Sequence, residues 1–319
     1  MKKRPAERPL LVALLAIAGS IMAAAGQESA PASPAKPKVK APPPPPEALA
    51  WMDELTVLPP GSFRDLPPVR TSFGLSWNNV FNAGEFVVSL NRSKESPQTL
   101  LVGVAEGRSN GLARALWPYD VEAEALVESR SLRPRLFEVA ETERGRAFHY
   151  RLEFGKDRVN TRTVVRDVKP KAGVEPVISE KTYRYQSLHD VLSAVLYIRS
   201  QPLADGDVIR AIISPFNRPY HTEFEVLGRE TRKIGREEYQ AIKLGIEIRK
   251  INSDRTLQTY EKMKKATIWL SEDDFRLPLE VQADIFVGYI SARMKEREWL
   301  DAAPAPGRVA SLGSLPTGR

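Results

Sequence analysis

Hydrophobic and polar residues alternate along most of the chain between about residue 68 and residue 300. An alternation with a period of two places one face of a β-strand on a core and the other in water, whereas a helix repeats every 3.6 residues. The runs 119–127 and 242–248 are clear examples, because apolar residues recur at every second position and most of the others are charged. The pattern predicts hairpins of an antiparallel sheet and argues against a parallel α/β sheet.

Short polar segments predict where these hairpins turn. We expect turns at residues 82–84, 155–157 and 271–274, and another at Gly288, because Gly, Asn and Asp adopt the backbone conformations that tight turns need. The segment 271–274 contains two adjacent aspartates. A turn accounts for both of them without a catalytic role.

One segment, residues 187–201, repeats its apolar residues at helical spacing instead. Ser187 is placed to cap the start of this helix, Asp190 falls in its first turn, and Pro202 ends it. A single amphipathic helix among many antiparallel strands predicts a curved sheet whose open side the helix fills. Residues 110–117 predict a short second helix. The expected fold class is all-β dominated, a curved antiparallel sheet with one main helix.

The first 25 residues have the three parts of a secretory signal peptide. A basic start with four lysines and arginines precedes an uncharged run over 10–25, which ends in three alanines. The run is shorter than the roughly 20 residues that span a bilayer. We therefore expect export to the periplasm, with an uncleaved membrane anchor as the alternative. No later stretch is apolar enough to span a membrane, so we expect no transmembrane segment after processing.

Residues 26–66 are rich in proline, lysine and alanine. Such a composition favours an extended polyproline II chain and buries little apolar surface, so we expect a disordered linker there. Residues 301–319 are rich in Ala, Pro, Gly and Ser and predict a disordered tail. The folded part is then a single antiparallel β domain over residues 67–300.

Composition excludes several kinds of chemistry. The chain contains no cysteine, which rules out disulfides, thiol nucleophiles and cysteine-bound metals. Its net charge is +7, but basic and acidic residues are mixed along the sequence, so we expect no nucleic-acid partner. The three histidines lack metal-ligand spacing, and no phosphate-binding loop or serine-nucleophile motif is present. We expect no catalytic residue, no metal and no cofactor.

Aromatic residues on the inward phase of the strands are the main candidates for ligand contacts. These candidates are Trp77, Phe86, Tyr150 and Trp269. They belong either to a packed core or to a concave face that holds a lipid, a glycan or an apolar peptide. Strand phase alone does not distinguish the two. His189 with Asp190 is a further candidate for a ligand contact, although capping of the helix is the simpler interpretation.

Four blocks of sequence occur in a familiar order. The first is an aromatic strand before A-G-E over 73–85, and the second runs from W-P-Y to S-L-R-P over 117–134. The third is L-H-D-V-L-S-A-V-L-Y-I-R-S-Q-P-L with A-D-G-D over 188–207, and the fourth is I-W-L-S-E-D-D-F-R-L-P-L-E-V over 268–281. Together they resemble the exported bacterial family catalogued as domain of unknown function 3108, over about residues 68–298. The last two blocks are the most specific.

This resemblance implies a half-barrel-like antiparallel domain of the periplasm, in agreement with the strand pattern. It implies no reaction and brings no catalytic residues. Asp190 and Arg199 lie at positions that recur in the family, and both have structural explanations, because the carboxylate can cap the helix and the guanidinium lies near the negative end of the helix dipole. A second hypothesis is that Arg199 reaches a carboxylate or a ligand inside the concavity.

The leading functional hypothesis is a non-enzymatic protein of the cell envelope that binds or assembles an apolar ligand, a glycan or an envelope protein. One alternative is a hydrolase of an envelope polymer, which would need two carboxylates about 5 to 9.5 Å apart in an open cleft. The other alternative is a structural module without a ligand, whose inward aromatic residues fill the core. The size and the lining of the largest concavity distinguish these three.

Overall fold

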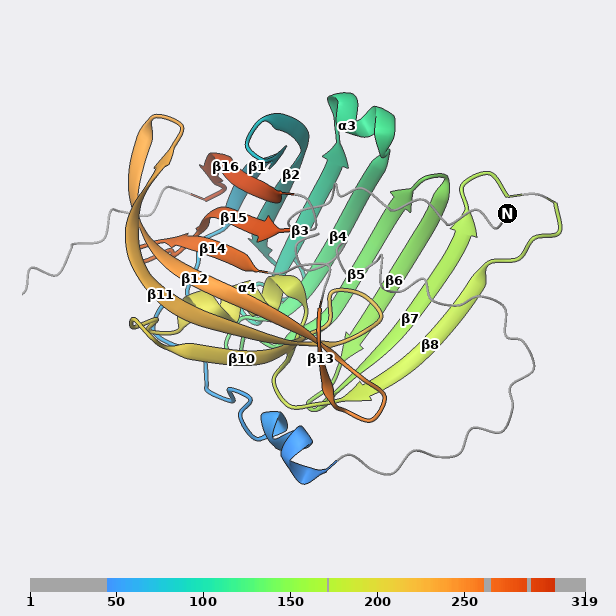
Figure 1. Ribbon diagram of the computed structural model, residues 1–319, viewed down its shortest axis with the longest axis horizontal. Coiled ribbons are helices and arrows are strands. Elements are labelled where there is room, and N and C mark those ends of the chain that lie inside the picture. The colour runs from blue at the N-terminus through green and yellow to red at the C-terminus, as the bar shows by residue number, and fades with distance from the viewer. Residues whose placement is uncertain (1–44, 171, 261–264, 286–287, 302–319) are drawn as a thin grey trace, which may run out of the picture.

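The computed structural model describes residues 45–170, 172–260, 265–285 and 288–301, and these form one large curved sheet (Figure 1). Its strands are β1 (Val69–Trp77), β2 (Phe81–Arg92), β3 (Leu100–Ser109), β4 (Tyr119–Glu128), β5 (Pro134–Glu143), β6 (Arg146–Phe154), β7 (Arg158–Asp167), β8 (Val177–Arg184), β9 (Leu188–His189), β10 (Val208–Ile213), β11 (Tyr220–Ile234), β12 (Glu237–Ile251), β13 (Leu257–Thr259), β14 (Ala266–Ser271), β15 (Pro278–Asp284) and β16 (Tyr289–Trp299). The helices are η1 (Pro46–Met52), α3 (Gly111–Leu116) and α4 (Val191–Ser200).

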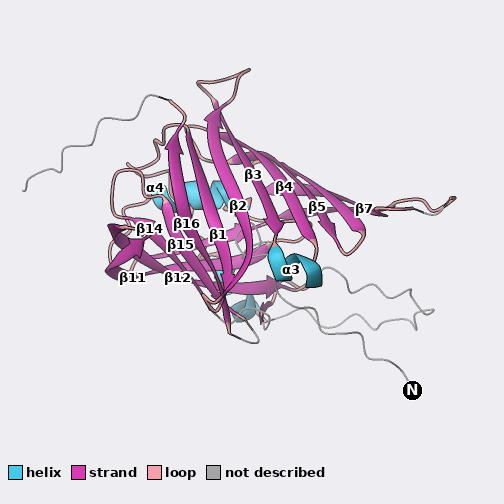
Figure 2. Cartoon of the chain, turned by 90° about the horizontal axis from the view of Figure 1, so that it is seen from above, coloured by secondary structure: helices cyan, strands magenta, loops and turns pink. Residues whose placement is uncertain are grey.

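The strand order follows the chain almost everywhere. It runs β8-β7-β6-β5-β4-β3-β2-β1-β16-β15-β14-β12-β11-β10-β9, with β13 paired to β12. Every pairing is antiparallel except the two-residue contact between β9 and β10. The sheet bends round into two arms without closing, and Figure 2 shows α4 between them. The expected fold class is confirmed: an all-β dominated, half-barrel-like antiparallel sheet with one main helix.

Helix α4 lies inside the concavity and divides the core into two adjoining parts. Ala194 and Ile198 pack with β10 to β12 and β14 to β16, whereas Leu192 and Leu196 pack with the side of β4 to β7. The helix is therefore buried on more than one side, although the sequence predicted an amphipathic helix with a single apolar face. No helix in the described part of the chain is both long and apolar enough to cross a membrane.

The start of α4 differs from the predicted one. Asp190, not Ser187, is the N-cap: its Oδ1 accepts hydrogen bonds from the backbone N–H groups of Leu192 at 2.7 Å and Ser193 at 3.1 Å. The Ser193 hydroxyl in turn accepts from the Asp190 N–H at 3.0 Å, which completes a capping box. Residues 188–189 pair with β10 instead of continuing the helix. Tertiary strand pairing thus takes the place of the first predicted helical turn.

The first hairpin also turns at a different place from the predicted one. Asn78 and Asn79 have φ values of 51° and 55°, and the Val80 N–H donates to the Trp77 carbonyl at 3.0 Å. Positive φ at both central residues is the type I′ geometry that suits a two-residue hairpin. Residues 82–84, where a turn was expected, lie within β2 at a break in its register with β1. The turns expected at 155–157 and Gly288 lie between strands, and the one expected at 271–274 begins at the last residue of β14.

Residues 46–66, expected to belong to the disordered linker, pack against the sheet instead. Trp51, Leu55 and Leu66 are buried in the core. The Trp51 Nε1 donates to the Arg255 carbonyl at 3.0 Å, and its ring meets that of His221 edge-on. The signal peptide expected over 1–25, the linker up to residue 44 and the tail beyond residue 301 lie outside the described residues.

The cap of α4 gives a first testable prediction. Asp190→Ala leaves two backbone donors at the start of a buried helix without their acceptor, so we expect the free energy of unfolding to fall by about 1 kcal/mol, within a range of about 0.5–2 kcal/mol. Burial raises the pKa of Asp190 to about 6, because the ionised carboxylate is poorly solvated there. The charge of Asp190 therefore lowers the stability of the folded protein at pH 7. Asp190→Asn keeps the acceptor and removes that charge, and it should lose less stability at pH 7. Urea denaturation followed by circular dichroism measures both, and equal losses would contradict the capping role.

Candidate functional site

The candidate site is a cavity of about 120 Å³ between α4 and the concave face of β1 to β5. Its lining is apolar except for the side chains of Thr71 and Arg199. Residues from α4 cover the sheet on one side, and Ile268, Leu277 and Pro278 close the cavity from the opposite arm. The cavity is therefore built where the single helix meets the first arm of the sheet.

The floor of the cavity is made of small residues at paired positions of β3 and β4. Gly103 of β3 pairs with Ala125 of β4, and two residues further along Ala105 pairs with Ala123. Residues two apart on a strand point to the same face, so these four form one patch of small residues. Larger side chains surround the patch, among them Leu90 and Val88 on β2 and Phe137 on β5.

The roof comes from α4, and its contact with the floor depends on a glycine. Val191, Leu192, Val195 and Leu196 all line the cavity. A Cβ atom added at Gly103 would lie 1.7 Å from Cδ2 of Leu192, so a larger residue there would force the Leu192 side chain to move. Leu192 thus packs directly against Gly103, and the neighbouring alanines are too small to fill the space beside this contact.

Two stacked phenylalanines form one wall of the cavity. The rings of Phe73 and Phe86 lie 4.5 Å apart with their planes at 3°. Phe86, a predicted ligand contact, is only 5% exposed and is among the lining residues. Of the four aromatic candidates from the sequence, Phe86 is the one that the structure places in the lining of this cavity.

Arg199 also lines the cavity, and its guanidinium donates hydrogen bonds to backbone carbonyls. Nε donates to the Phe275 carbonyl at 2.6 Å, and the terminal nitrogens donate to those of Arg64 and Asp274. Burial, and then the nearby Arg276, lower the pKa of Arg199 to about 10, so it stays charged at neutral pH. In the described part of the chain its hydrogen-bond partners are carbonyls and not the carboxylate that we had considered.

The other three aromatic candidates lie elsewhere. Trp77 is at the end of β1 and is 36% exposed. Tyr150 is buried against Phe216, with the ring centroids 4.6 Å apart. Trp269 follows Ile268 on β14 and so points to the opposite face of the sheet, where its Nε1 donates to Glu230 at 2.7 Å and Arg232 lies over its ring. The inward phase expected for Trp269 is therefore wrong.

His189 and Asp190 are both buried at the start of α4. The His189 ring stacks on Tyr197 at 5.0 Å, and burial lowers the pKa of His189 to about 4, so the ring is neutral at pH 7. Asp190 is fully buried and caps the helix through Oδ1. The structure brings the two residues together with α4 but places neither in the lining of the cavity.

A buried carboxyl on the concave face was missed in the sequence. Glu141 of β5 is 3% exposed, and it accepts hydrogen bonds from the hydroxyls of Tyr119 at 2.6 Å and Tyr150 at 3.2 Å. Burial raises the pKa of Glu141 to about 7. Strand phase could have found it, because Glu141 follows Phe137 and Val139 at intervals of two on the inward face. Its hydrogen-bond donors within the described residues are phenols, whereas a two-carboxylate hydrolase would need a second acid.

Comparison with known proteins finds a matching family model and leaves the ligand open. The model of a family described as protein of unknown function DUF3108 matches residues 72–295. No curated protein matches the chain. A beta-barrel-like protein of domain of unknown function DUF1849 from Brucella abortus is similar at 11% identity and a TM-score of 0.49, covering 74% of this chain and 99% of that one.

Two further solved structures are more distant. A candidate exported protein with a YmcC-like fold from Bacteroides fragilis is similar at 9% identity and a TM-score of 0.29, covering 75% of this chain and 99% of that one. A candidate lipoprotein from Parabacteroides distasonis is similar at 6% identity and a TM-score of 0.28, covering 76% of this chain and all of that one. No functional argument follows from similarities at this level.

Glu141 gives a pH-dependent prediction. The folded protein holds the Glu141 proton more tightly than the unfolded chain, so stability falls as the pH rises from about 4.5 to about 7. At 1.36 kcal/mol per pKa unit the full change is about 3 kcal/mol. Glu141→Gln removes this titration, so its unfolding free energy relative to wild type should rise across that pH range. Glu124→Gln, at an exposed position of β4, is the control and should leave the slope unchanged. Parallel pH profiles for wild type and Glu141→Gln would refute the assignment.

Proposed function

The chain belongs to the DUF3108 family of proteins of unknown function, and from that premise we propose that it is an exported, non-enzymatic envelope protein that binds an alkyl chain. The ligand is an apolar or amphiphilic molecule whose chain enters the cavity between α4 and β1 to β5. The apolar lining of that cavity is the observation that carries the proposal. Export to the periplasm is proposed from the signal-peptide pattern of residues 1–25.

The chemistry of the lining favours an alkyl chain over a glycan. Thr71 and Arg199 are the polar residues in the lining, and the Thr71 hydroxyl and the Arg199 guanidinium already donate to backbone carbonyls. A sugar would leave its hydroxyls without partners there, at a cost of about 1–3 kcal/mol for each buried group. An alkyl chain gains about 0.8 kcal/mol for each methylene that it buries.

The size of the cavity fits the end of a single chain. An engineered apolar cavity of about 150 Å³ stays dry and binds benzene, so a cavity of about 120 Å³ has room for a short alkyl segment. Larger side chains at Ala105 and Ala123 would fill this space and bury more apolar surface there. A sequence that leaves the space open supports a binding role over a purely structural module.

Filling the floor of the cavity tests this proposal. Ala123→Leu projects a larger side chain from the patch of small residues and displaces about two methylene groups of a ligand, which should weaken dodecanoate binding about tenfold. Ala140→Leu is the matched control, because Ala140 is exposed on the neighbouring strand β5. Calorimetric titration of dodecanoate measures both variants, and urea denaturation should show Ala123→Leu to be at least as stable as wild type.

Native mass spectrometry of protein purified from the periplasm is the second readout. We expect an adduct with the mass of a lipid or fatty acid, which Ala123→Leu should carry less often than Ala140→Leu. Protein that is always empty, together with dodecanoate binding that Ala123→Leu does not change, would overturn the proposal and favour the structural module.

A further inference from the structure

Large apolar side chains are exposed together at one end of the sheet. We call this group the apolar rim, and it consists of Trp77, Val80 and Phe81 of the β1–β2 hairpin with Leu112 and Leu116 of α3. Val80 is 73% exposed, Phe81 54%, and each of the two leucines 67%. Single exposed apolar residues are common on protein surfaces, but a contiguous group of them marks an interaction site.

The two parts of the apolar rim are held side by side. The backbone of Asn110, which precedes α3, donates to the Ala83 carbonyl of β2 at 3.3 Å, and Gly84 pairs with Ser109. On the hairpin, the ring centroids of Trp77 and Phe81 are 5.9 Å apart. On the helix, Leu112 and Leu116 are four residues apart and share one face, while Ala113 packs towards the core.

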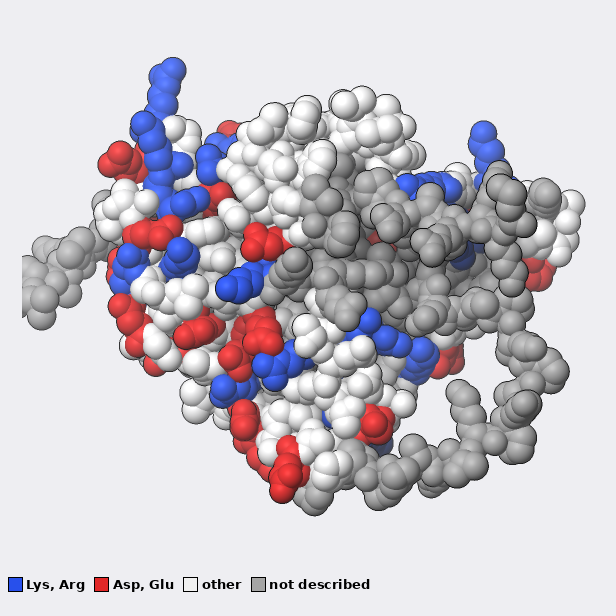
Figure 3. All heavy atoms as spheres, in the orientation of Figure 1, with Lys and Arg blue, Asp and Glu red and all other residues white. Residues whose placement is uncertain are grey.

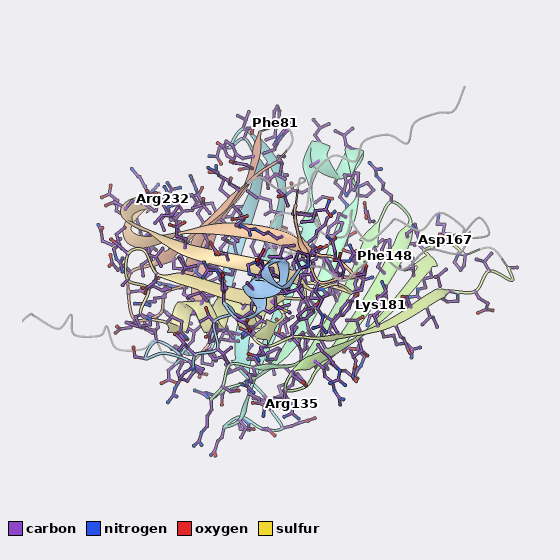
Figure 4. The ribbon with its side chains drawn as sticks, turned by 60° about the horizontal axis from the view of Figure 1, so that its bottom comes forward. Phe81, Arg135, Phe148, Asp167, Lys181 and Arg232 are labelled. Atoms are coloured by element: carbon purple, nitrogen blue, oxygen red, sulfur yellow. The ribbon has the colours of Figure 1, made fainter. Side chains whose placement is uncertain are left out.

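The apolar rim projects from the molecule and does not form a groove. Figure 1 shows the β1–β2 hairpin and α3 as protrusions at the same end of the sheet. Figure 4 labels Phe81 at this end and Arg135, at the start of β5, at the other. In Figure 3 the surface over the hairpin and α3 is largely free of charged side chains. Projecting apolar tips can enter a fluid interface without a complementary pocket.

Basic side chains border the apolar rim. Arg144 and Arg146 flank the next turn along this end, between β5 and β6, where Arg144 lies over the ring of Trp117 at 3.5 Å. Neither arginine makes an ion pair within the described residues, although Glu143 is adjacent in sequence. Apolar residues beside arginines are complementary to a lipid surface that contains anionic headgroups.

The apolar rim and the cavity lie along the same face of β1. Trp77, Leu75 and Phe73 are successive inward residues of β1, and Phe73 lines the cavity. At about 3.4 Å per residue, the four steps along the strand from Trp77 to Phe73 span about 14 Å. The proposed site therefore lies about 14 Å from the rim along β1, with the buried Leu75 between them.

We propose that the apolar rim docks on the surface of a lipid bilayer, with Val80, Phe81, Leu112 and Leu116 inserted among the headgroups. The docking deepens the proposed function by naming the membrane as the source or the destination of the ligand, but it does not depend on a filled cavity. A second copy of the chain is the competing occupant of this surface.

A fluorophore at the rim tests the docking directly. Because the chain has no cysteine, Leu116→Cys can be labelled at one position with the environment-sensitive dye NBD in protein purified from the periplasm. We expect its emission to increase and shift to the blue with vesicles of phosphatidylcholine and phosphatidylglycerol, and less with phosphatidylcholine alone. Leu227→Cys is the matched control, because Leu227 is 51% exposed on β11 in the other arm, and its label should not respond.

Further variants distinguish a failure of membrane docking from a failure of ligand binding in the cavity. Adding Val80→Ser and Phe81→Ser to labelled Leu116→Cys should abolish the vesicle response, whereas adding Ala123→Leu should preserve it even where dodecanoate binding is lost. A response of both labels, or of neither, would overturn the docking and leave the cavity proposal standing. A blue shift that rises with protein concentration without vesicles, together with dimers in analytical ultracentrifugation, would assign the rim to a second copy instead.

Discussion

The packing of α4 inside an open sheet is the interaction on which the rest of the structure depends. A sheet that does not close leaves its concave face without a second layer, and an apolar sheet face must be buried against another element. The chain has no cysteine, so no disulfide holds the arms together. The helix joins them by contributing side chains to both parts of the core.

Polar contacts at both ends hold this helix in place. Asp190 satisfies the first backbone donors, and the residues after the C-terminal end are held by Arg276, which donates to the carbonyls of Gln201 and Pro202. Arg199 reaches from the helix to the loop after β14. Each of these two buried arginines donates to carbonyl oxygens, which provides hydrogen-bond acceptors without a buried carboxylate. Arg199, a candidate for ligand binding in the sequence, therefore also has a structural role in fixing the roof of the cavity.

Local sequence patterns predicted the strands well, because a period of two is visible within a few residues. Features that depend on contacts between residues far apart in the sequence were harder to predict. Ser187 resembles a helix cap, but pairing of 188–189 with β10 delays the helix, and Trp51 becomes buried only because Arg255 and His221 lie beside it. The cavity itself depends on the register that places Gly103 beside Ala125, which no single strand reveals. Glu141 is different, because its inward phase on β5 is visible in the sequence.

Two departures from maximal stability occur in the same arm of the sheet. Small residues on β3 and β4 leave a cavity under α4, and large apolar residues at the ends of β1 and α3 and the start of β2 remain in water. Larger side chains in the first place and polar ones in the second would each favour a stable, soluble protein. Trp77, Leu75 and Phe73 connect the two places along one face of β1. Because the two departures lie along one face of the same strand, the proposed role in handling alkyl chains at a membrane would account for both, whereas a purely structural module would account for neither.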